Sequence, residues 1–133
     1  MPTVWDIEKS LLNGFHDALL RGYRVDFVGR TLSFDLEVST GDPEAAEPAA
    51  RDTYRAATLT LTRLAFCEVQ APDSRYPFQN PAPLRVDLVE CDATHLAVRA
   101  AGPSAFAASF FVTNWNAFIH FAAEDATLEW RKR

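Results

Sequence analysis

The sequence is poor in the features that mark several large classes of protein. Its two cysteines, Cys67 and Cys91, form no Cys-x-x-Cys pair and are too few for a disulfide framework. No apolar run approaches the roughly 20 residues that a helical membrane span needs. The first residues lack a basic stretch followed by an apolar core, so we expect no signal peptide. The expected location is therefore the cytoplasm of a bacterial cell.

Catalytic and cofactor motifs are equally scarce. The five glycines form neither a dinucleotide-binding pattern nor a P-loop, and no serine lies in a Gly-x-Ser-x-Gly elbow. The three histidines, His16, His95 and His120, form no His-x-His or His-x-x-x-His pair of the kind that chelates zinc. We therefore predict no catalytic residue, no metal ligand and no cofactor.

The chain is rich in the hydrophobic residues that form a protein core. Hydrophobic residues make up 48% of its 133 residues, with ten phenylalanines and three tryptophans, which favours one folded domain over residues 1–133. The net charge of −5 gives no electrostatic footprint for nucleic acid or for anionic lipid. Such an acidic balance suits a basic partner, and it also serves solubility alone.

The first residues predict a short helix. Thr3 and Asp6 have the spacing of a capping box, and Asn13-Gly14 is a stop signal. Apolar residues between them recur on one face: Val4, Ile7, Leu11 and Leu12.

The rest of the chain has the period of β-strands. Residues 23–27 and 32–38 alternate between apolar and polar types around a turn at Gly29-Arg30, which predicts a hairpin with one buried face. Residues 40–51 indicate a surface loop, and residues 54–69 a long strand. That strand contains a bulge or bend near Thr62-Arg63, where the apolar positions change phase.

A proline-rich loop over residues 71–83 separates this strand from a predicted meander of five short strands. The strands are centred on Val86, Val98, Ala108, Ile119 and Leu128, and the apolar run 105–112 predicts a central position or one under the helix. The expected fold is mostly β, α+β at the margin. It is an antiparallel β-sandwich or strongly curved sheet of about eight strands, with one short N-terminal helix. A small closed β-barrel is the alternative.

Two polar positions are candidate binding residues. His16-Asp17 lies between the helix and the hairpin, where the pair either bonds the backbone at the turn or contributes to a ligand site. His120 and His95 fall at polar positions of their strands, which predicts side chains that face outward.

Aromatic residues in turns supply the other candidates. Tyr76 and Phe78 lie in the proline-rich loop, where they pack back onto the sheet or meet a partner. Trp115 lies at a predicted hairpin tip, where it either anchors a partner or folds over the sheet edge.

The His16-Asp17-Ala18 triplet, Arg24-Val25-Asp26 and the alternating run 32–36 resemble a group of small uncharacterised bacterial β domains. Those domains open with a helix, a His-Asp-small triplet and an alternating hairpin, and some are grouped with immunity proteins of bacterial toxin systems. The resemblance covers residues 5–38. It implies a non-enzymatic protein that binds another protein, and it carries over no catalytic residue.

Three functional hypotheses follow. The first is a protein-interaction module, immunity-like or forming a homodimer through a sheet edge or face. The second is a sandwich or barrel that binds a small molecule among its phenylalanines. The third is a metal-dependent or acid–base enzyme that uses His16, Asp17 and His120.

Overall fold

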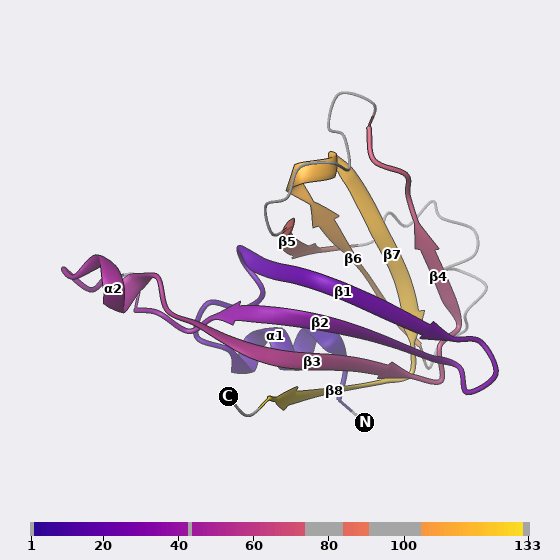
Figure 1. The fold of residues 1–133 in the computed structure, drawn as a ribbon. Coiled ribbons are helices and arrows are strands. Elements are labelled where there is room, and N and C mark those ends of the chain that lie inside the picture. The colour runs from indigo at the N-terminus through magenta and orange to yellow at the C-terminus, as the bar shows by residue number, and fades with distance from the viewer. Residues whose placement is uncertain (1, 43, 74–83, 91–104, 132–133) are drawn as a thin grey trace.

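The computed structural model describes residues 2–42, 44–73, 84–90 and 105–131. These residues form one antiparallel sheet of eight strands in the order β4-β7-β6-β5-β1-β2-β3-β8 (Figure 1). β4 and β8 end this order, so the described strands make an open and strongly curved sheet rather than a closed barrel. The mostly β fold that the sequence predicts is confirmed.

Helix α1 (Val4–Ser10) begins at the predicted capping box. Thr3 Oγ1 accepts a hydrogen bond from the Asp6 amide at 3.2 Å, and the Asp6 carboxylate accepts one from the Thr3 amide at 2.8 Å. The helix ends at Ser10, three residues before the predicted stop signal. Its Trp5 indole N–H donates to the Ala107 carbonyl at 3.2 Å, which fastens the helix to β6.

The predicted hairpin is confirmed as β1 (Ala18–Asp26) and β2 (Thr31–Ser39), which pair along their length. Every second residue of β2 is buried, as the alternation predicts. The segment predicted as a loop between this hairpin and the next strand also contains a short helix, α2 (Pro48–Arg51).

The long strand predicted over residues 54–69 is wrong. The chain forms β3 (Tyr54–Thr62) and β4 (Phe66–Val69), which lie in opposite halves of the sheet, since β3 pairs with β2 and β8 whereas β4 pairs with β7. Between them Arg63 has a φ of +53°, a left-handed conformation that ends an extended strand. The change of phase at Thr62-Arg63 therefore marks a bend, the second of the two predicted alternatives, and this bend separates two strands that lie in different halves of the sheet.

The last third of the chain contains β5 (Leu84–Val89), β6 (Phe106–Val112), the 3₁₀ turn η1 (Thr113–Trp115), β7 (Ala117–Ala123) and β8 (Asp125–Trp130). The predicted strand around Val98 lies outside the described residues. A simple meander is wrong, because β8 pairs with β3 and not with β7. No helix within the described ranges is long and apolar enough to span a membrane.

The core lies where the two halves of the curved sheet face each other. The ring of Phe110 on β6 lies 5.0 Å from Phe34 of β2, 5.6 Å from Phe121 of β7 and 5.8 Å from Phe15. These four rings are fully buried. The interior position predicted for residues 105–112 is confirmed, because β6 lies between β5 and β7.

We expect Phe110→Ala to lower the free energy of unfolding by about 3–5 kcal/mol, because it removes contacts to three other rings and leaves a cavity. Phe27→Ala is the control: this ring is 84% exposed, and its loss changes stability by no more than about 0.5 kcal/mol. Urea unfolding measures both. Equal effects would contradict the placement of the core.

Candidate functional site

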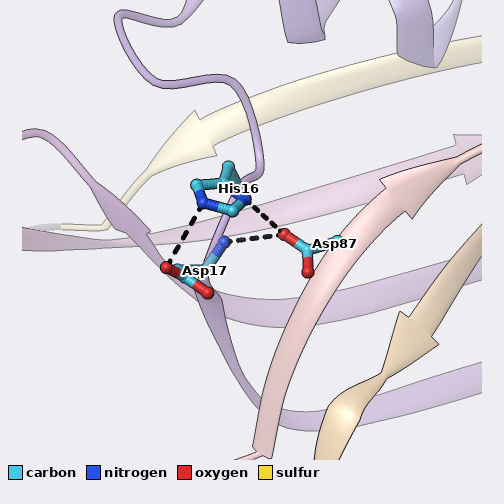
Figure 2. Close-up of side chains that lie close together, drawn as sticks. All are labelled: His16, Asp17 and Asp87. Atoms are coloured by element: carbon cyan, nitrogen blue, oxygen red, sulfur yellow. Dashed lines mark hydrogen bonds and ion pairs between the residues drawn. The ribbon is translucent and has the colours of Figure 1, made fainter.

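Strand pairing brings together three polar side chains that are far apart in the sequence. β1 starts at Ala18, which pairs with Val86 of β5, so the residues just before β1 lie beside those just after Val86. His16 and Asp17 thereby meet Asp87, as Figure 2 shows. The sequence singles out His16-Asp17 but not Asp87, whose alternation with apolar residues predicts only a solvent-facing side chain.

The three residues form a compact hydrogen-bonded group, which we call the His16 cluster. Asp87 Oδ1 lies 2.7 Å from His16 Nδ1 and accepts the Asp17 backbone N–H at 3.1 Å. On the other side of the ring, Asp17 Oδ2 lies 3.4 Å from His16 Nε2. The potential ligand atoms of the three residues lie within 4.8 Å of one another.

The two carboxylates constrain the imidazole. If His16 Nδ1 donates to Asp87, the neutral ring turns the lone pair of Nε2 toward an anionic oxygen of Asp17. A proton on Nε2, or a cation between Nε2 and Asp17, removes that repulsion. A carboxylate behind a histidine that faces a cation is the arrangement found around protein metal ligands.

Glu8 of α1 adds a further acid to this region. Its Oε2 accepts the Phe15 backbone N–H at 2.7 Å. Partial burial raises the pKa of Glu8, and although the Phe15 bond opposes this rise, the negative charge of Asp87 adds to it. Glycine suits position 14, because its φ of +56° lies in the left-handed region and a Cβ there would meet the Glu8 carboxylate.

The His16 cluster is open to water. The side chain of His16 is 74% exposed, and those of Asp17 and Asp87 are 43% and 31% exposed. A cleft of about 240 Å³ adjoins it, lined by Asn13, His16, Asp17, Ser39, Gly41, Arg51, Asp52 and Tyr54. Such exposure suits reversible contact with a polar group and does not exclude water as acid–base chemistry commonly requires.

His120 lies on the face of the sheet opposite the Phe110 core, as its polar position predicts, but its side chain is only 7% exposed rather than open to water. β7 is an interior strand, and His120 lies opposite Ser109 of β6 and Glu68 of β4. Ser109 Oγ lies 2.6 Å from its Nδ1, and the Phe118 ring stacks on it at 5.4 Å. A buried and hydrogen-bonded histidine of this kind serves the packing of the strand.

The aromatic candidates have different outcomes. Trp115 follows the second of its two predicted alternatives, since it is 7% exposed and belongs to the core rather than to an exposed anchor. Tyr76 and Phe78 lie outside the described residues. Cys67 is a half-buried free thiol, and burial raises the pKa of its thiol, which disfavours the reactive thiolate.

The structure exposes an apolar pair that the sequence analysis missed. Phe27 and Val28, at the tip of the β1–β2 hairpin, are 84% and 97% exposed. Asp26 Oδ1 holds the turn by accepting the Val28 and Gly29 backbone N–H groups at 3.0 and 2.9 Å. The composition of the turn could have revealed this exposed pair, because tight turns favour glycine, asparagine and aspartate over a phenylalanine–valine pair.

Asp17 has a φ of +57°, so its role at the turn can be separated from the role of its carboxylate. Asp17→Gly and Asp17→Ala both remove the carboxylate, but only glycine adopts this backbone conformation without cost. We expect the alanine variant to be less stable than the glycine variant by about 1 kcal/mol in chemical denaturation. Equal stabilities would contradict a constrained turn.

Glu8 gives a pH-dependent prediction. An acid whose folded-state pKa is raised stabilises the fold fully below its ordinary value of 4.5, and this contribution is lost as pH rises through the folded-state pKa. Glu8→Gln keeps an acceptor for the Phe15 N–H. We therefore expect the variant to gain stability relative to the wild type as the pH rises above about 4.5 in urea unfolding. A constant difference would contradict the raised pKa.

Comparisons with known proteins give one similar structure and no family. No protein-family model matches the chain, and no curated protein matches it. The chain is similar to the crystal structure of an uncharacterized protein from Neisseria gonorrhoeae, with 12% sequence identity and a TM-score of 0.44. The match covers 86% of this chain and 91% of the other.

Proposed function

We propose that this protein is a non-enzymatic, protein-binding module of the bacterial cytoplasm. Its contact surface is the free side of β1 together with the hairpin tip. We call residues 22–26 the open edge and residues 27–30 the tip. The observation that carries the proposal is the exposure of Phe27 and Val28 beside a strand edge that has no neighbour among the described strands.

No strand of the described part of the chain pairs with the open edge on the side away from β2. β1 pairs with β2 as far as Asp26, but it pairs with β5 only from Ala18 to Leu20. Within the part of the chain that the structure describes, no strand covers residues 22–26 on the β5 side. An uncovered edge offers backbone N–H and C=O groups to an added strand, which is a common way of binding extended peptide.

The side chains of this surface have the composition of a protein interface. Tyr23 is 43% exposed, and Arg24 beside it is also exposed. Figure 1 shows the tip projecting past the ends of the neighbouring strands, so Phe27 and Val28 are accessible to a partner. Aromatic residues and arginine are enriched at interfaces, where they supply much of the binding energy.

The resemblance of residues 5–38 to domains grouped with toxin-system immunity proteins also supports a protein partner. Immunity proteins act by contact rather than by catalysis. The segment that carries the resemblance includes the open edge and the tip. An immunity-like role is therefore part of the proposal.

Two alternatives have less support. For a small-molecule site, β6 borders a cleft of about 460 Å³ at Ala107, together with Trp5, Lys9 and Glu90, but the described lining of this cleft contains no phenylalanine. Phe110 itself is packed against three other rings. For a metal-dependent enzyme, His16 and Asp17 are near Asp87 but open to water, and His120 lies on a different strand, bonded to Ser109.

The test compares two sets of exposed apolar residues. A double variant with Phe27→Ser and Val28→Ser removes the apolar surface of the tip, while Leu12→Ser removes a 72% exposed leucine near the opposite end of β1. A partner captured from lysate by the wild-type protein is identified, purified and titrated against each variant. We expect the tip variant to bind at least about ten-fold more weakly, with an unchanged melting temperature, and Leu12→Ser to bind as the wild type does.

Unchanged affinity in the tip variant would contradict the proposed surface. A loss of affinity in both variants alike would also contradict it, because the effect would then not be confined to the tip.

A further inference from the structure

We infer that the partner of the open edge is a second copy of this chain. The two β1 strands pair antiparallel about a two-fold axis that passes through Val25. This inference rests on the proposed function and names the occupant of its surface. The resulting interface is isologous, since the same residues contribute from both copies.

The length of the free segment fits this pairing. The register of β1 shifts between Leu20 and Gly22, and the pairing with β5 ends at Leu20. With Val25 at the centre, the strand residues 24–26 of the two copies lie opposite one another, and the turn of each copy lies beside Gly22 and Tyr23 of the other. The tip of each copy therefore reaches only as far as the point where β5 begins to cover β1.

The side chains match across the axis. Tyr23 and Val25 pair with Phe34 and Leu32 of β2 and so share their face of the sheet. On this face Val25 meets its own counterpart, and Tyr23 of each copy lies beside the turn that carries Phe27 of the other. Aromatic and β-branched pairs are the cross-strand contacts that stabilise antiparallel strands most.

The other face carries the charges. Arg24 of each copy lies opposite Asp26 of the other, which gives two symmetry-related ion pairs. Neither residue has a salt bridge within the described part of the chain. Asp26 uses Oδ1 for the turn, so its other carboxylate oxygen is available to an arginine.

Charge also excludes the neighbouring registers. A two-fold axis normal to the sheet requires that residues lying opposite each other point to the same face. The two strands can therefore slide only by two residues, and each such slide moves the residue on the axis by one position. Centring the axis on Arg24 places two arginines opposite each other, and centring it on Asp26 places two aspartates opposite each other. Like charges directly opposite are destabilising, so the Val25 register is the favoured one.

The test is a charge swap between two variants, Arg24→Glu and Asp26→Lys. Each variant alone places like charges opposite each other twice, so we expect a dimer dissociation constant at least about ten-fold higher than that of the wild type. Mixed in equal amounts, the two chains restore opposite charges at both positions and form a heterodimer. Analytical ultracentrifugation and native mass spectrometry measure both results.

Thermal melts confirm first that each variant is folded, because Asp26→Lys also removes the acceptor of the turn. Should Asp26→Lys fail to fold, Asp26→Asn takes its place, and recovery on mixing is then expected to be partial. A wild-type protein that stays monomeric, a dimer insensitive to Arg24→Glu, or a mixture that does not associate would each overturn the inference.

These outcomes are separable from failure of the proposed function. A monomer whose tip is still needed to bind a different protein disproves the dimer and leaves the binding module standing. A monomer whose tip variant binds that protein with unchanged affinity disproves both.

Discussion

The ladder between β1 and β5 consists of three residue pairs, Ala18 with Val86, Leu19 with Arg85 and Leu20 with Leu84. It joins two four-stranded halves of the sheet, β1-β2-β3-β8 and β5-β6-β7-β4. Because the sheet curves across this joint, Phe34 from one half reaches Phe110 and Phe121 from the other. The aromatic core, and with it most of the burial that stabilises the fold, depends on this short connection.

The same ladder places the His16 cluster and the open edge. Its first pair sets Asp87 against His16 and Asp17, where one carboxylate oxygen bonds a ring nitrogen and a backbone amide together. Its last pair is Leu20 with Leu84, and beyond it the open edge pairs with no described strand on the β5 side. A longer ladder between β1 and β5 would cover the open edge, and a shorter one would move Asp87 away from His16 and Asp17.

Three polar side chains near the joint hydrogen-bond backbone groups of the surrounding loops. Glu8 bonds the backbone of Phe15, the Asn13 side chain donates to the Gly41 carbonyl at 2.8 Å, and Asp87 bonds the backbone of Asp17. Each satisfies a backbone group that no regular element covers, which is costly to leave unpaired. The loop between α1 and β1 is thereby fixed, and so is the start of β1.

Short-range pattern in the sequence was sufficient to predict α1 and β2. The capping box at Thr3 and Asp6 begins α1, and the strict alternation of residues 32–38 gives β2, because both signals act between near neighbours in the chain. The pattern also identified His16-Asp17 as a polar interruption between helix and strand, but not its partner on β5.

The local pattern of the sequence could not predict how the two halves of the sheet connect. The bend at Arg63 was expected inside one long strand, and β8 was expected beside β7, because alternation says which face is buried and not which strand lies alongside. For the same reason alternation placed His120 on the outer face but did not predict its contacts with Ser109, Gln70 and Phe118.

The sequence by itself determined that this is a β protein with a capped helix and a large aromatic core, since composition and period are local properties. Only the tertiary structure decided that Asp87 completes the His16 cluster, that β1 extends beyond its described pairing with β5, and that Phe27 and Val28 are exposed. The first two depend on where β5 stops pairing with β1, and that is set by packing between residues distant in the chain.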